Sequence, residues 1–379
     1  TTASSIQGVQ PMVSGPAAGQ VGFAGATANG QAPANNYGGA VAAAKSRGAK
    51  WFPESVYIAD ALSTLSEAHA QAATSAQHCA WWSSGNTNFP KGNNSGALKD
   101  TNDTTVTLTS AGNATHAAFA LAGSGVPFAK TTHNGQACGV SDVAGNIYKI
   151  NPGLTCVATT KTITGATQTN PVQLTVTAHG YTTGQIAQVE SVVGMTQINS
   201  RIYAITVIDA NTISLNGVDG TAFPARTSGG TVTTGKFYAL KPSVDIATLT
   251  GGASLATDFW GATGVAANYD EIALNLRTDF PNNTTAQRYG NEGNQVFAWG
   301  TATERLQSML GMPAAGGTSV AGTALMGNDY YFQYFRHDLC VISRGNWSLG
   351  SSAGVRFRHL DVARANAYIS VGFAASRYL

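Results

Sequence analysis

Residues that could carry out chemistry are few and scattered in this chain. Only 11% of its 379 residues are charged, well below the roughly 25% of ordinary soluble domains. Apart from His78 and Cys79, the only close soft pair is His133 with Cys138. A metal site needs two further donors, so loop and core roles are favoured and metal binding is left open. Acidic residues are dispersed and no H-E-x-x-H motif occurs, so we predict no catalytic residue and no cofactor.

Residues 348–373 combine a frame of small and apolar residues with fillers that share neither size nor charge. The frame comprises Gly350, Ala353, Gly354, Val355, Leu360, Ala363, Arg364, Asn366, Val371, Gly372 and Phe373. The filler residues are Ser348, Leu349, Ser352, Arg356, Phe357, Arg358, His359, Asp361, Val362, Tyr368, Ile369 and Ser370. Each alone is an ordinary surface residue, but the set within this frame predicts a ligand-binding surface.

The free energy of burying a side chain limits where such fillers can lie. A random side chain in a core would cost roughly 1 to 5 kcal/mol, so we expect the fillers to point to solvent, mainly on one face. Glycines at 350, 354 and 372 allow tight turns. The residues expected to point inward are Trp347, Val355, Leu360, Val371 and Phe373. Phe357 and Tyr368 are the expected anchors, because exposed aromatic residues supply much of the contact energy in interfaces.

The elements that must position this tail differ along the chain. Residues 1–48 are rich in Gly, Ala, Gln and Asn, which predicts an irregular arm that is either a linker or an assembly contact. Ile58, Leu62, Leu65 and His69 have helical spacing, which predicts an amphipathic helix over about 53–73. A second helix is expected at 301–310.

The composition changes near residue 160. Residues 159–234 are rich in Thr, Val and Ile, in short alternating runs separated by Gly, Asn-Pro and Asp-Gly turns, which predicts a small all-β module. The expected host domain then consists of residues 49–158 and 235–379, with a variable region at about 344–379. The predicted class is α+β, with an inserted all-β domain and an irregular N-terminal arm.

Bulk composition excludes some partners. The net charge is +2, so no strong field favours nucleic acid. No run of eighteen apolar residues occurs, so we expect no membrane insertion. The small neutral residues, including 44 glycines, are typical of fibrous assemblies, adhesins and virion proteins.

Several motifs resemble a known family. "CGVSDVAGNIYKI" and "RGNWSLGSSAGV" are similar to segments of the C-type lectin fold of the formylglycine-generating-enzyme type. The tail resembles the variable region of proteins diversified by retroelements, and "NFPKG" and "KTTHNGQACG" resemble phage tail-fibre proteins of this group. Residues 159–234 resemble a β-barrel module of phage tail proteins.

Two departures from the family bear on chemistry. Enzymes of this fold have a cysteine pair for copper-dependent oxidation where this chain has Trp347, Ser348 and Leu349, so a non-enzyme is predicted. The family's W-E-W segment becomes Tyr148-Lys149-Ile150. This removes an acidic group that lies near a calcium site in relatives, so calcium binding is left open.

The tail also fits the diversification chemistry that the resemblance implies. That process replaces adenines, and asparagine codons of the AAC type changed at their first two bases never yield Lys, Glu, Gln, Met or Trp. None of these five types occurs from Ser348 to Leu379.

The resemblance implies a receptor-binding protein at the tip of a phage tail fibre, in the virion. It would bind a host-cell receptor, protein or glycan, would be a homotrimer, and would join other fibre proteins through residues 1–48. The alternatives are a cellular display protein on the bacterial surface or in the cytoplasm, diversified in the same way, and a copper oxidase of the enzyme branch.

Overall fold

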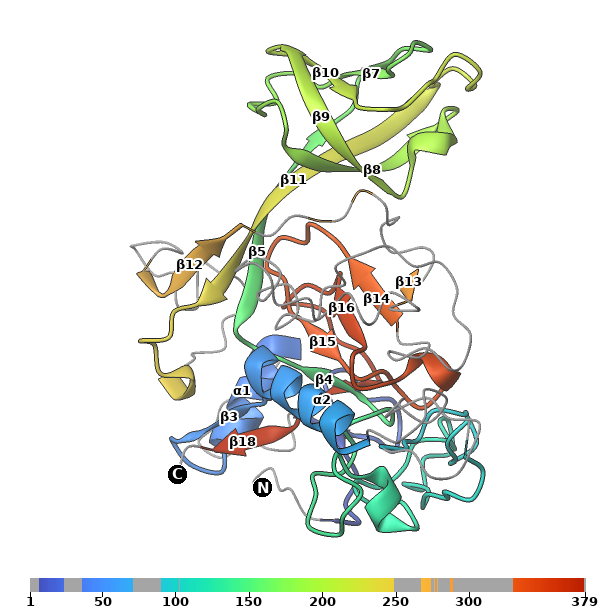
Figure 1. Cartoon of the computed structure of the whole chain (residues 1–379), viewed down its shortest axis with the longest axis vertical. Coiled ribbons are helices and arrows are strands. Elements are labelled where there is room, and N and C mark those ends of the chain that lie inside the picture. Colours follow the sequence, from blue (N-terminus) through green and yellow to red (C-terminus); the bar gives the residue numbers. More distant parts are fainter. Residues whose placement is uncertain are drawn as a thin grey trace.

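The computed structural model is mainly β, with two α-helices among the residues it describes (Figure 1). It describes residues 7–23, 36–70, 90–101, 103–248, 267–273, 276, 278, 287–288 and 330–377. The α+β prediction therefore overstates the helical content of this part of the chain. The helix expected at 301–310 lies outside the described residues.

A six-stranded sheet carries the C-terminal tail. Its strand order is β13-β14-β16-β15-β4-β17, and its strands are β4 (Tyr148–Ile150), β13 (Gln287–Arg288), β14 (Tyr330–Gln333), β15 (Ile342–Ser343), β16 (Arg358–Leu360) and β17 (Val371–Gly372). The last strand, β18 (Ala375–Arg377), pairs with β3 (Trp51–Pro53). Figure 1 shows these two strands beside the C-terminus. A strand from early in the sequence thus pairs with the last strand of the chain.

Helix α2 (Val56–Ala70) lies within the range that the sequence predicted, but its buried face is different. Ala59, Ser63 and Ser66 are fully buried, whereas Leu65, expected on the apolar face, is 44% exposed. Because Ser63 donates a hydrogen bond to the carbonyl oxygen of Val355, a small polar residue fits here where a leucine would not. The predicted periodicity was therefore right for the helix and for Ile58 and Leu62, which pack against the hydrophobic clusters, and wrong for Leu65.

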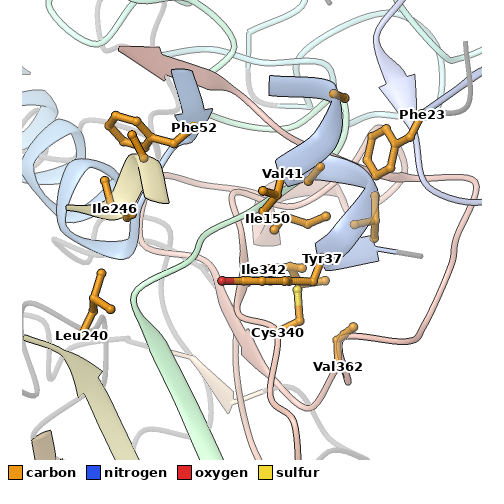
Figure 2. Close-up of a cluster of buried hydrophobic side chains, with 14 of the residues drawn as sticks. Phe23, Tyr37, Val41, Phe52, Ile150, Leu240, Ile246, Cys340, Ile342 and Val362 are labelled. Carbon is orange, nitrogen blue, oxygen red and sulfur yellow. The ribbon is translucent and has the colours of Figure 1, made fainter. Parts of the chain in front are cut away.

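Helix α1 (Asn36–Lys45) corrects the prediction of an irregular arm for these residues. Its alanines favour helix, and Ala40, Ala43 and Ala44 are fully buried. Figure 2 shows Tyr37 and Val41 of this helix beside Ile150, Cys340 and Ile342 of the sheet region. An Ala-rich face lets α1 pack closely against the sheet region. The sequence did not predict this packing, because the segment has few large apolar residues.

Residues 7–23 also pack on their own chain. They contain the parallel pair β1 (Met12–Val13) and β2 (Val21–Gly22). Val13 and Phe23 are buried in two different hydrophobic clusters. The segment is thus part of the core around the tail, and its expected role in fibre assembly stays a prediction.

A separate hydrophobic cluster lies within residues 163–232, here called the β module. Its strands are β6 (Gly165–Ala166), β7 (Gln173–Thr175), β8 (Ile186–Val193), β9 (Arg201–Asp209) and β10 (Thr212–Leu215). Two long strands, β5 (Leu154–Thr162) and β11 (Ser228–Leu240), run side by side from the main body to the module in Figure 1. Strand β12 (Tyr269–Ile272) pairs with the opposite end of β11.

Short 3₁₀ turns complete the described elements: Phe128–Thr131, Thr196–Ile198, Ile246–Thr248 and Gly350–Ser352. Neither α-helix in the described ranges has the length and apolar character needed to cross a bilayer.

Candidate functional site

The frame of the tail lies where the sequence predicted. Val355 and Leu360 are fully buried, Val371 is nearly so, and Trp347 packs with its ring 5.4 Å from Phe119. Phe373 is only half-buried, and its ring lies 5.6 Å from that of Phe23.

The structure explains why two positions of the frame are glycine. Gly350 has a φ of 61°, a left-handed conformation that favours glycine. At Gly372 a Cβ atom would lie 2.4 Å from the carbonyl oxygen of Met12, so this position needs glycine for a close approach. The frame therefore fixes the backbone.

The prediction of one exposed face of fillers is wrong for five of the twelve. These five residues are buried: Ser352, Arg356, Phe357, Arg358 and Val362. Val362 belongs to the cluster beneath α1 in Figure 2. The sequence could not reveal this because the covering groups come from distant segments.

The two buried arginines have partners that make their burial tolerable. Arg356 donates to Asp60 Oδ1 at 2.7 Å and to Thr64 Oγ1 at 3.1 Å, both on α2. Arg358 donates from Nη1 to the carbonyl oxygens of Phe357 and Val355 at 2.9 and 3.1 Å. A buried charge needs such pairing. Both arginines therefore support the sheet rather than face a ligand.

Seven fillers remain accessible. Ser348 and Tyr368 are exposed, and five are half-buried: Leu349, His359, Asp361, Ile369 and Ser370. Trp347 and Ile369 join one small cluster with Val13, which places the segment around residue 348 near that around residue 369. Accessible fillers thus gather at this cluster and along β16.

The N-terminal segment holds the tail by its backbone. Gly15 N donates to the carbonyl oxygen of Tyr368, and Ser14 N donates to that of Val371. Gln20 Nε2 donates to the carbonyl oxygen of Ile369 at 3.0 Å, and Tyr368 N donates to Ser14 Oγ at 2.9 Å. These contacts fix residues 368–371 without using their side chains.

Along β16 the side chains alternate between the two faces of the sheet. His359 pairs in register with Phe332 of β14 and Ile342 of β15. The ring centroid of His359 lies 4.0 Å from that of Phe332, 4.7 Å from that of Phe357 and 5.6 Å from that of Tyr148. We call Tyr148, Phe332, Phe357 and His359, with Asp361, the aromatic face.

The aromatic face carries an acid–base pair. Asp361 Oδ1 lies 3.3 Å from His359 Nδ1, and Arg336 Nε donates to the carbonyl oxygen of Asp361 at 2.8 Å. Burial opposes ionisation of Asp361, but His359 and Arg336 outweigh it and lower its pKa. Burial, with the charge of Asp361, raises the pKa of Tyr148. At neutral pH the face therefore holds an ionised carboxylate and a protonated phenol beside stacked rings.

A cavity of about 520 Å³ lies between the N-terminal segment, residues 122–149 and residues 373–375 of the tail. Its walls include the buried ion pair of Glu54 and Arg344, with Lys149 and Asp142. Lys149 donates to the carbonyl oxygens of Ile147 and Gly145 at 2.7 and 3.3 Å. Burial lowers its pKa to about 8, although Asp142 opposes this.

Sequence reasoning singled out none of these four charged residues as a buried group. Single charges without a motif carry no such signal. A signal was available for the aromatic face, because Phe357, His359 and Asp361 alternate with Arg358 and Leu360, the spacing of a strand.

The described residues offer little catalytic chemistry. Burial raises the pKa of Cys340 to about 12 and that of Cys156 above its ordinary value, so these thiols stay protonated. No group of three or more His, Cys, Asp or Glu side chains that could hold a metal occurs within the described ranges. His133 and Cys138 thus gain no further ligand there, and Cys79 lies outside them.

Residues 350–354 match the spacing G-x-S-x-G. Sequence reasoning overlooked this motif. In hydrolases that serine sits exposed on a turn from strand to helix. Here Ser352 is 4% exposed, at the end of a 3₁₀ turn. The match therefore does not form a nucleophile elbow.

No protein-family model matches this chain, and no curated protein matches it.

Proposed function

We propose that this protein is a receptor-binding protein of a phage tail fibre, with a C-type lectin-type domain, an inserted β module and a diversified tail. The observation that carries the proposal is the way in which residues 368–371 are fixed. Ser14, Gly15 and Gln20 of the N-terminal segment form hydrogen bonds with backbone atoms of this stretch. Side chains on such a backbone can change without loss of these contacts, which is what a surface built to vary requires.

The proposed surface is narrower than the full set of fillers. It comprises Ser348, Leu349, His359, Asp361, Tyr368, Ile369 and Ser370, because these side chains are accessible. Tyr368, at 44% exposure, is its anchor. Phe357 is fully buried and packs against His359 and Tyr148 within the aromatic face, so it is not an anchor.

The partner is a host-cell surface molecule, protein or glycan. The protein acts at the fibre tip as a homotrimer, since repeated weak contacts gain strength through effective concentration. The closed arrangement of β3 with β18, and the module on two long strands, support a lectin-type host domain with an insertion. The protonated Cys156 and Cys340 support a binding protein rather than an oxidase.

Cell binding tests the proposal directly. The labelled full chain is titrated onto intact cells of a panel of bacterial strains, in parallel with Tyr368→Ala and with Leu65→Ala on α2, where the side chain is equally exposed at 44%. We expect binding to some strains, a loss of at least about tenfold for Tyr368→Ala, and none for Leu65→Ala. Equal binding of all three proteins would contradict the proposed surface.

The DNA beside the gene tests the diversification separately. We expect a near-copy of the tail with adenines at the accessible filler codons, next to a reverse transcriptase. Identical tails across many independent isolates would contradict it.

A further inference from the structure

The β module is joined to the sheet body by paired strands rather than by a linker. Strands β5 and β11 stay in antiparallel register from Leu154 opposite Ala239 to Thr162 opposite Thr231. On β11, Phe237 is buried in the main hydrophobic cluster and Val232 in the cluster of the module. Because the same strand is buried in both cores, the module has a set orientation relative to the tail.

The segment that follows β14 fills the junction between the two bodies. Phe335 N donates to Gln188 Oε1 of the module at 2.8 Å, and Gln188 is only 2% exposed. A Cβ atom at Gly235 would lie 2.7 Å from Cδ1 of the Phe335 ring, so a glycine is needed there for the ring to fit. Segment 334–336 is therefore held by the module.

From this segment a chain of contacts leads to the aromatic face. Burial, together with the charge of Glu190 on the module and a side-chain hydrogen bond between Glu190 and Tyr334, raises the pKa of Tyr334. The Arg336 guanidinium lies 4.6 Å from the centroid of the Tyr334 ring. Arg336 also donates to the carbonyl oxygen of Asp361, which contacts His359.

We propose that the β module helps to position the binding site, and that Glu190 is a positioning residue that acts through Tyr334 and Arg336 on Asp361 and His359. This inference rests on the proposed function, because it assigns the module to the same surface. Glu190 orients the Tyr334 ring, the ring supports the Arg336 guanidinium, and Arg336 holds the backbone of Asp361. The module is then neither a spacer nor a separate binding unit.

The test measures the pKa of the Asp361 carboxyl group, from the NMR signal of its carboxyl carbon, in the free full-length protein. The titratable and charged groups that act on this carboxyl are His359, Arg336, Tyr148 and Tyr334. In Glu190→Ala the Tyr334 hydroxyl loses its acceptor, so we expect Arg336 to lose its support and the Asp361 titration to move to higher pH. Loss of the Glu190 charge alone would move it to lower pH, since a like charge disfavours ionisation. The sign therefore separates positioning from simple electrostatics.

Two further variants keep the test decisive. Arg336→Met should move the Asp361 titration in the same direction, and Glu271→Gln, which breaks the exposed 2.9 Å pair with Lys236, should leave it unchanged. An upward shift in Arg336→Met with none, or a downward one, in Glu190→Ala would overturn the role of the module. If Glu190→Ala lost the amide spectrum of the module, Tyr334→Phe would replace it with the same expected shift and the same contrary result. No ligand is needed, so failure here is distinct from failure of the cell-binding assay.

Discussion

The β module and the C-terminal tail are built in opposite ways. The module draws its core from residues 163–232 alone, and most of its paired strands follow one another in the sequence, with β10 also pairing with β7. The tail consists of strands of two or three residues that pair with partners from residues 51–53, 148–150 and 330–333. It also buries charged side chains, including Arg344, Arg356 and Arg358. Apolar alternation is enough to specify a local core, whereas the tail depends on long-range polar partners.

The largest effect should come from the buried charges beside the tail. Arg344→Met removes one partner of the pair with Glu54, and both residues are almost fully buried. Leaving a buried carboxylate uncompensated costs about 3 to 5 kcal/mol, so the free energy of unfolding from urea titrations should fall by that amount. Lys236→Met, in an exposed ion pair, should leave the free energy of unfolding almost unchanged. Equal costs would mean that the tail does not depend on its buried charges.

A core deletion in the module should be nearly as costly but should stay local. Leu174→Ala removes a fully buried side chain and should cost about 2 to 5 kcal/mol. Hydrogen exchange should show lost protection within residues 163–232 while β14 to β16 remain protected. If protection fell equally in both regions, the module would not be an independent core.

A third prediction concerns pH and the sheet that carries the tail. The pKa of Lys149 falls from 10.5 to about 8 on folding, so between these values the unfolded chain holds the extra proton. The free energy of unfolding should therefore rise with pH, on the order of 2 kcal/mol between about pH 8 and pH 10, relative to Lys149→Met. Urea titrations of both proteins across that range check this. If the difference in free energy of unfolding between the two proteins did not change with pH, the lowered pKa of Lys149 would be contradicted.

The smallest effect concerns the hydrogen bond that ties α2 to the tail. Ser63 Oγ donates to the carbonyl oxygen of Val355 at 2.6 Å, and Ser63→Ala should cost about 0.5 to 1.5 kcal/mol. Ser66 is equally buried but bonds only to Leu62 within its own helix. Ser66→Ala should therefore cost less, as measured by thermal unfolding. The reverse order would show that the link to the tail adds little.

Several features could be predicted from particular residues. Alternating Val and Ile placed strands within residues 159–234, and spacing placed a helix near 53–73, within which α2 runs from Val56 to Ala70. The inward frame at Val355, Leu360 and Val371 followed from residue size. Burial of Arg356 could not be predicted, because its acceptor Asp60 lies on α2, far away in the sequence. The helix at Asn36–Lys45 was missed because alanines carry little hydrophobic signal.

The sequence by itself determined where the strands of the β module form, which tail residues are too small or too apolar to vary, and how few chemical groups the chain offers. Only the tertiary structure decided which fillers face solvent. The reason is that burial of a polar side chain depends on whether the fold supplies its hydrogen-bond partners. Arg356 finds them on α2, far away in the sequence, and Arg358 finds them in the carbonyl oxygens of Val355 and Phe357, whereas Ser348 and Tyr368 remain at the surface.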